Sequence, residues 1–186
     1  TQPSKRSCLS IKGTRCSWPS GKVMGGSSVL NYMIYTRGNS RDYDEWAKMG
    51  NEGWSFGEVL PYFEKLEANE NSSVGALKIS TSKWHSPLYK PLMQAFEQFG
   101  VSRGDYNGES QIKISPIQFT IWNNFRYSSN RAYIRPIKDS RRNLVIKTYA
   151  HVLKVLIDEE GKRALGVLVE IKGRIFKIGV SKEVIL

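Results

Sequence analysis

The chain has 186 residues with 40% apolar and 11% aromatic content, which is typical of a globular protein and excludes an intrinsically disordered chain. Its formal net charge is +11, but the Lys and Arg residues are scattered, which argues against a nucleic-acid partner. No apolar run approaches the roughly 20 residues that a membrane-spanning helix needs.

The two ends of the chain favour a fragment of a longer protein. The chain begins at Thr1 without an initiator Met and stops at Leu186 inside a strand-like run. Cys8 and Cys16 flank a short turn-like stretch and can form a disulfide, which favours a secreted protein; two free thiols are the alternative. The sequence predicts no metal site, because it has no C-x-x-C motif and its two His residues are far apart.

A glycine-rich loop interrupts the apolar, aromatic run of residues 21–38. Gly25 and Gly26 have no Cβ, so the backbone can take positive φ and another group can approach its N–H donors. The next two serines add hydroxyls, and a helix starting after them would add partial positive charge. Asn31 offers a donor and an acceptor to a ring. The loop thus favours a phosphate-bearing cofactor; the alternative is a glycine turn packed on the core.

Helices are predicted downstream of this loop. Capping residues and apolar periodicity predict one helix over about 40–50 and another over about 88–99. Between them, residues 55–66 start with capping-box spacing, and Pro61 divides the segment into two short helices. A further helical turn is predicted at 128–134.

Strand patterns occur in the middle and at the end of the chain. Residues 76–81 and 117–122 predict short strands. Residues 143–186 are rich in Val and Ile and predict a β-meander, with strands at 144–148, 151–157, 164–171 and 174–180. The turn-like stretches at 158–162 and 172–173 would join the later strands into hairpins.

The glycine loop and its surroundings resemble a signature of the glucose–methanol–choline (GMC) oxidoreductase family, most closely its insect glucose dehydrogenase branch. The signature residues are those at 21–31, Tyr35, Arg37, Gly38 and 42–46. Further blocks resemble the family at 53–55, 59–65, 105–108, 126–129, 132–136, 143–152 and 182–186. The likeness therefore spans nearly the whole chain.

The resemblance implies a mixed α+β or α/β fragment of the GMC-type FAD-binding fold. Residues 1–67 would supply the FAD-covering loop and short helices, 68–142 part of the substrate-binding region, and 143–186 the β-meander that returns to the FAD-binding domain. The first Rossmann βαβ unit, with its G-x-G-x-x-G fingerprint, and the catalytic His are not in the sequence. The fragment alone is therefore expected to be inactive and to hold no catalytic residue.

The resemblance also implies the cofactor, FAD, and the residues that bind it. Those expected to bind FAD are Gly25, Gly26 and Ser27 along the pyrophosphate, Asn31, Tyr32 and Ile34 near the flavin, and Val152 at the adenine. The substrate would be an alcohol or a sugar that gives a hydride to flavin N5, and the electron acceptor would be a quinone or oxygen.

Two alternative functions remain open at this point: a non-catalytic secreted relative of the family, and a basic module that binds a polyanion. His85 and His151 are interpreted as ordinary polar residues rather than as replacements for the catalytic His. The sequence also departs from the family pattern twice. Ser20 stands where Arg is usual, and Asn124 stands where Gly is usual, a mild change because Asn tolerates left-handed backbone.

Overall fold

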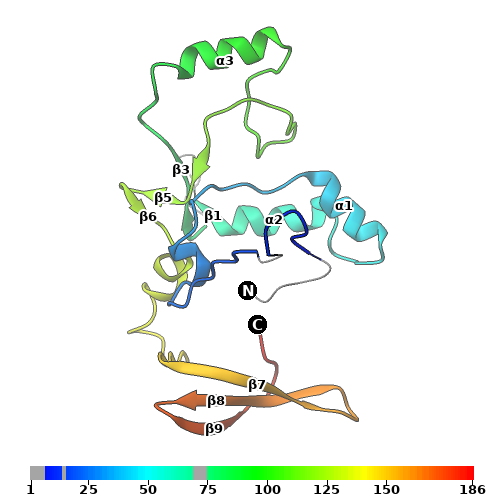
Figure 1. Cartoon of the computed structure of the whole chain (residues 1–186), viewed down its shortest axis with the longest axis vertical. Helices are drawn as coiled ribbons and strands as arrows, with labels where there is room; N and C mark the ends of the chain where they lie inside the picture. Colours follow the sequence, from blue (N-terminus) through cyan, green and yellow to red (C-terminus); the bar gives the residue numbers. More distant parts are fainter. Residues whose placement is uncertain (1–6, 14–15, 69–74) are drawn as a thin grey trace. The chain divides into compact units, whose positions relative to one another are not determined.

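The computed structural model of the chain describes residues 7–13, 16–68 and 75–186. The chain divides into two compact units, residues 1–137 and 138–186. The first contains the helices and short two-stranded sheets, and the second contains one three-stranded sheet (Figure 1). The result is a mixed α and β architecture.

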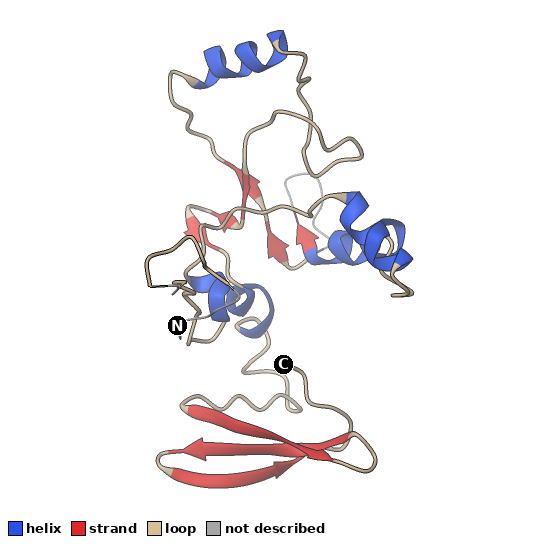
Figure 2. Cartoon of the chain, turned by 45° about the vertical axis from the view of Figure 1, so that its right-hand side comes forward, coloured by secondary structure: helices blue, strands red, loops and turns tan. Residues whose placement is uncertain are grey.

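Helices α1 (Ser40–Lys48) and α2 (Phe56–Leu66) pack against each other in the first unit (Figures 1 and 2). The Oδ1 atom of Asn39 accepts a 2.9 Å hydrogen bond from the Arg41 amide and caps α1. The Tyr43 ring lies 5.9 Å from the Phe63 ring, centroid to centroid, so aromatic contacts join the two helices. The predicted helix at 40–50 is confirmed.

The predicted break at Pro61 is wrong, because α2 continues through it. Proline lacks an N–H group, so the carbonyl of Gly57, four residues earlier, loses its helical donor. Gly57 is exposed, and water can donate to that carbonyl instead.

The predicted capping box at the start of α2 is confirmed. The Glu58 carboxylate accepts a 3.1 Å bond from the Ser55 amide.

The short strands of the first unit form pairs. Strand β1 (Glu67–Ala68) pairs in parallel with β2 (Leu77–Lys78), while β3 (Ser80–Thr81) pairs antiparallel with β4 (Gln118–Phe119), and β5 (Ile121–Trp122) with β6 (Phe125–Arg126). Each predicted strand is thus divided in two. Ile79 donates to the Ala68 carbonyl and Thr120 to the Met33 carbonyl, so the backbone changes partner at both breaks.

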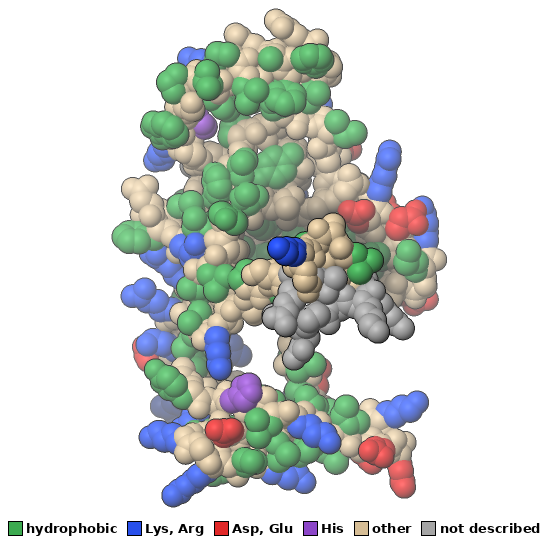
Figure 3. All heavy atoms as spheres, viewed as in Figure 1, with side chains coloured by type: hydrophobic (Ala, Val, Ile, Leu, Met, Phe, Trp, Pro, Cys, Tyr) green, Lys and Arg blue, Asp and Glu red, His purple; other side chains and the backbone are tan. Residues whose placement is uncertain are grey.

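Helix α3 (Tyr89–Gln98) is followed by Gly100, whose φ of +85° lets the chain turn away, as predicted. A turn of π-helix, η2 (Asn130–Ile134), takes the place of the helical turn expected near Ser128. Apolar side chains gather on the face around α3 that Figure 3 shows, and several are exposed: Leu88, Leu92, Phe96 and Phe99.

The second unit is an antiparallel meander of β7 (Ala150–Asp158), β8 (Arg163–Ile171) and β9 (Arg174–Gly179), with β8 in the centre (Figure 1). The predicted hairpin turns are confirmed, and Lys172 and Gly173 both have positive φ. The predicted strand at 144–148 is wrong. In the described part of the chain that segment pairs with no strand, and β7 pairs only with β8.

Candidate functional site

The glycine loop turns through two consecutive residues with positive φ. Gly25 has φ +98° and Gly26 has φ +54°, which agrees with the conformational freedom expected of them. They lead into η1 (Gly26–Val29), a single turn of 3₁₀-helix. Because η1 has only four residues, it lacks the aligned peptide dipoles of the longer helix that could have followed.

The glycines of the loop differ in what surrounds them. A Cβ on Gly25 would lie 3.0 Å from the Val29 side chain and 3.1 Å from Asn130 Cβ, so its missing side chain is needed for packing. A Cβ on Gly21 would lie 2.3 Å from the Gly26 carbonyl carbon. A Cβ on Gly26 would have no atom within 4 Å. Gly26 therefore presents bare backbone to open space.

The hydroxyl groups of the loop shape it from inside. The Ser27 Oγ atom accepts a 3.1 Å bond from the Gly21 amide. The Ser28 Oγ atom donates a 2.5 Å bond to the Gly25 carbonyl and accepts a 3.0 Å bond from the Ser129 amide. The first two bonds close the loop on itself, and the third joins it to a segment about 100 residues further along the chain.

Arg126 joins the loop to β6. Its Nη1 atom donates to the Ser28 carbonyl at 3.2 Å, the Asn31 carbonyl at 2.7 Å and the Asn31 Oδ1 atom at 2.8 Å. The same Oδ1 accepts from the Met33 amide at 3.1 Å. The side-chain carbonyl of Asn31 is therefore used within the protein. Its Nδ2 group has no hydrogen-bond partner among the described residues, and Asn31 is exposed.

The side chains predicted to meet a ring are open to the surroundings. Tyr32 is 90% exposed and Ile34 is 54% exposed. The backbone of Ile34 is held by a bridge to Phe119 on β4, so its position is fixed although its side chain is free. Val152 lies in the second unit, opposite the buried Val169 of β8, and is half exposed. Six of the seven predicted residues thus share one loop, while Val152 lies on a separate sheet.

A buried ionic network lies directly after the loop. The Arg37 guanidinium donates to the Glu67 carboxylate at 2.7 Å from Nε and at 2.6 Å from Nη2, and the Tyr35 hydroxyl donates to the same carboxylate. Burial and the hydrogen bond to Glu67 raise the pKa of Tyr35, and the bonds to Glu67 raise the pKa of Arg37. The network fixes Tyr35 and Arg37 against the start of β1.

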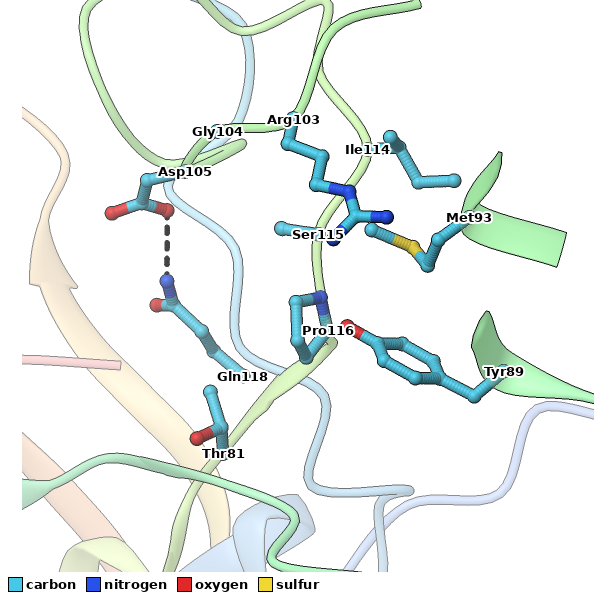
Figure 4. A pocket seen from close by; sticks show the side chains of 10 residues that line it. All are labelled: Thr81, Tyr89, Met93, Arg103, Gly104, Asp105, Ile114, Ser115, Pro116 and Gln118. Carbon is cyan, nitrogen blue, oxygen red and sulfur yellow. Dashed lines mark hydrogen bonds between the residues drawn. The ribbon is translucent and has the colours of Figure 1, made fainter. Parts of the chain in front are cut away.

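A second cluster of hydrogen bonds holds the 105–108 turn against residues 35–37. Asn107 accepts from the Arg37 amide at 2.8 Å through Oδ1, and the Tyr106 hydroxyl donates to the Tyr35 carbonyl at 2.7 Å. Gln118 donates a 2.8 Å bond to Asp105 at the edge of a cavity of about 390 Å³ (Figure 4). The turn therefore has a structural role in which its polar side chains are engaged.

A larger cavity of about 890 Å³ lies along β3, β4 and β5. Its lining combines hydroxyl and amide groups with aromatic side chains: Ser80, Thr81, Ser82, Lys83, Trp84, Phe119, Ile121, Trp122, Asn123 and Asn124. Asn123 and Asn124 form the β5–β6 turn with φ of +50° and +62°. Asn124 thus adopts the left-handed backbone that the usual Gly would take.

Three functional candidates were missed by reasoning from sequence: Glu67, Arg126 and Ser129. Arg126 and Ser129 fall in a block that resembles the family, but nothing in their local pattern indicates that they contact the loop. Glu67 lies at the end of a helix, where an acidic residue is usually solvated. Their partners are 30 to 104 positions away, and local periodicity carries no information about such pairs.

Cys8 and Cys16 form a disulfide with Cα atoms 5.8 Å apart. His85 stacks on Tyr89 with ring centroids 4.3 Å apart, which agrees with an ordinary packing role. In the described part of the chain, no helix is both long and apolar enough to cross a membrane.

The loop suits an anionic group that carries a ring. Residues 20–38 contain no Asp or Glu, and Lys22 is exposed within them. The backbone at Gly26 is open on the side where a Cβ would lie, and the exposed Tyr32 and Ile34 offer apolar surface nearby in the chain. The Gly26 amide already donates to the Val23 carbonyl at 2.8 Å. The loop therefore offers a phosphate close approach to its bare backbone and the Lys22 cation, and it offers a planar ring apolar surface.

Comparison with known proteins identifies a family. Residues 4–186 match the family model described as GMC oxidoreductase. The chain is 43% and 41% identical to glucose dehydrogenases [FAD, quinone] of Drosophila pseudoobscura pseudoobscura and Drosophila melanogaster, over 100% of this chain and 31% of each relative. It is 37% identical to the oxygen-dependent choline dehydrogenase of Brucella melitensis, over 95% of this chain and 33% of that protein.

Solved structures have the same fold. Pyridoxine 4-oxidase from Mesorbium loti matches 87% of this chain and 33% of its own, with a TM-score of 0.79 and 25% identity. A formate oxidase matches 89% of this chain and 31% of its own, with a TM-score of 0.74; at 22% identity it supports the fold alone. The chain spans about a third of the length of the curated relatives it matches.

Proposed function

This chain belongs to the GMC oxidoreductase family, and from that premise we propose that the protein is an FAD-dependent oxidoreductase acting on CH–OH groups. The observation that carries the proposal is the open backbone at Gly26 inside an acid-free loop. The relatives named glucose dehydrogenase [FAD, quinone] support the cofactor. The substrate we propose is an alcohol or a sugar, and the acceptor a quinone or oxygen.

In this proposal the loop binds the cofactor through main chain and side chain together. Gly25, Gly26 and Ser27 line the pyrophosphate, with Lys22 adding positive charge. Asn31 presents its free Nδ2 group to the polar edge of the flavin, since its Oδ1 atom already accepts from Arg126. Tyr32 and Ile34 offer apolar surface to the ring. Val152 serves the adenine through its backbone.

FAD, when bound, supplies the hydride acceptor for oxidation of the substrate carbon. The residues of this chain bind and orient it and exclude water from one side of the ring. We assign none of the described residues as the base that takes the hydroxyl proton, because His85 stacks on Tyr89 and His151 lies in β7 of the second unit. We propose that this base comes from another part of the full-length protein.

We propose the large cavity along β3, β4 and β5 as part of the substrate side. Its hydroxyl and amide groups can hydrogen-bond to a hydroxylated substrate, and its Trp rings can stack on one. Residues 1–67 then form the cofactor-covering part, 68–142 contribute to substrate binding, and 143–186 return to the FAD-binding domain. The Cys8–Cys16 disulfide supports a secreted protein.

The test of this proposal is an FAD titration of the full-length protein carrying Gly26→Leu. The Leu side chain would occupy the open space beside the loop backbone, so the Kd for FAD should rise by at least about 10-fold. Gly50→Leu is the matched control, because Gly50 also has positive φ (+95°) and open space but follows α1. Equal FAD binding by both variants would refute the loop assignment.

A further inference from the structure

The segment 126–130 contacts the glycine loop and holds it in place. Figure 1 shows the loop, in blue, beside η2, in yellow-green, which agrees with the contacts between them. Its contacts with the loop come from Arg126, Ser129 and Asn130, which lie about 100 positions downstream of the residues they touch. The conformation of the glycine loop therefore depends on this distant segment as well as on its own sequence.

Arg126 and Ser129 capture carbonyl oxygens of the loop. The Arg126 guanidinium bonds to the carbonyls of Ser28 and Asn31 at 3.2 and 2.7 Å. The Ser129 Oγ atom donates to the Gly25 carbonyl at 3.1 Å. A peptide carbonyl carries partial negative charge, and an exposed one repels phosphate. These three carbonyls therefore direct their negative ends toward Arg126 and Ser129 rather than toward a ligand.

Packing adds to these hydrogen bonds. Asn130 lies so close to Gly25 that a Cβ there would be 3.1 Å from Asn130 Cβ and 3.3 Å from its backbone nitrogen. The Ser129 amide donates to the Ser28 Oγ atom at 3.0 Å, which fixes the side chain that itself donates to the Gly25 carbonyl. Backbone, side chain and packing therefore all set the same conformation at Gly25.

We infer that Arg126 and Ser129 are positioning residues for the cofactor: they hold the loop in the form that exposes Gly26 to the FAD phosphates. This inference rests on the proposed function. The Arg126 guanidinium and the Ser129 hydroxyl act on the cofactor through the loop. Removing either group should loosen residues 25–31 and weaken FAD binding, while the rest of the first unit stays folded.

The test compares Arg126→Gln and Ser129→Ala in the full-length protein. Arg126→Gln removes a cationic donor that serves three acceptors, so the Kd for FAD should rise by about 10- to 100-fold; Ser129→Ala should raise it by about 10-fold. Arg126→Lys should restore part of the affinity, because the ammonium also donates. Arg135→Gln is the control, since Arg135 is exposed and its side chain has no partner among the described residues.

Hydrogen exchange of the FAD-free protein separates positioning from general stability. Arg126→Gln should accelerate exchange of the amides in 25–31 and leave those of α1 and α2 unchanged. Equally faster exchange in both helices, or an FAD Kd within twofold of Arg135→Gln, would overturn the inference. A wild-type protein that binds no FAD would refute the proposed function, which is a different outcome from a variant that binds as tightly as wild type.

Discussion

The buried hydroxyl of Tyr35 stabilises the segment that follows the glycine loop. It is 8% exposed and donates to Glu67, which also receives two bonds from Arg37. The carboxylate is thereby satisfied from three directions, which is the condition under which a buried charge is tolerated. Removing the Tyr hydroxyl leaves the Arg37–Glu67 pair intact and so isolates one hydrogen bond.

Tyr35→Phe should lower the free energy of unfolding by about 2 kcal/mol near neutral pH, because it removes a buried bond to a charged group. The raised pKa of Tyr35 also predicts a pH dependence. The unfolded chain loses the Tyr proton near pH 10 and the folded protein at higher pH, so this stabilisation is complete below about pH 10 and declines above it.

Urea unfolding of the wild type and the variant from neutral pH to about pH 11 measures both effects. Tyr62→Phe is the control, because Tyr62 is 71% exposed. The wild type should lose stability above about pH 10 more steeply than Tyr35→Phe. Parallel curves for the two proteins would mean that Tyr35 does not carry the alkaline sensitivity.

The glycine pair marks how far single residues could be predicted from sequence. Positive φ is allowed at Gly25 and Gly26 because neither has a Cβ, and both adopt it. Reasoning from sequence assigned the same role to both glycines, whereas their surroundings in the structure differ. Gly25 packs against Val29 and Asn130, and Gly26 faces open space. The difference depends on a segment 100 residues away and has no local signal.

At the level of elements, local rules predicted the helices better than the strands. Asn39 caps α1 and Gly100 follows α3, since both effects operate within one turn. The run at 144–148 has the composition of a strand but pairs with none in the described chain, because a strand also needs a neighbour. The helix break at Pro61 was predicted from the low helix propensity of proline alone, and α2 continues through it.

Pro61→Ala should raise the free energy of unfolding by about 2 kcal/mol. Pro61 is exposed within α2, and Ala would restore the amide that donates to the Gly57 carbonyl. Thermal or urea unfolding of the full-length protein measures the change. Glu64→Ala, at an exposed position of the same helix, should have little effect. A fall in stability for Pro61→Ala would show instead that the Pro ring makes a packing contact outside α2.

For the whole molecule, the family could be predicted from ordered blocks of residues, while the contacts that give those blocks their roles could not. The blocks at 21–38, 105–108 and 126–129 are separate in the sequence and meet in the first unit through Asn107 and Arg126. Side-chain bonds between these blocks span 70 to 104 positions. They explain in physical terms why these blocks occur together.

Cofactor binding should stabilise the whole first unit, because a ligand that binds only the folded state shifts the unfolding equilibrium. At an FAD concentration about 100-fold above Kd, the free energy of unfolding of the full-length protein should rise by about 2.7 kcal/mol. Gly26→Leu should keep at most about 1.4 kcal/mol of this increase at the same concentration, because a Kd raised 10-fold leaves FAD only about 10-fold above it.

The salt dependence distinguishes stabilisation by specific FAD binding from non-specific attraction of an anion to a chain of net charge +11. Binding of a polyanion such as heparin should fall steeply as salt rises, because it depends on counterion release. The FAD-induced rise in melting temperature should persist at about 0.5 M NaCl, where exposed charges are largely screened but close main-chain contacts are not. A stabilisation by FAD that disappears with salt as heparin binding does would favour a polyanion-binding module over the flavoprotein.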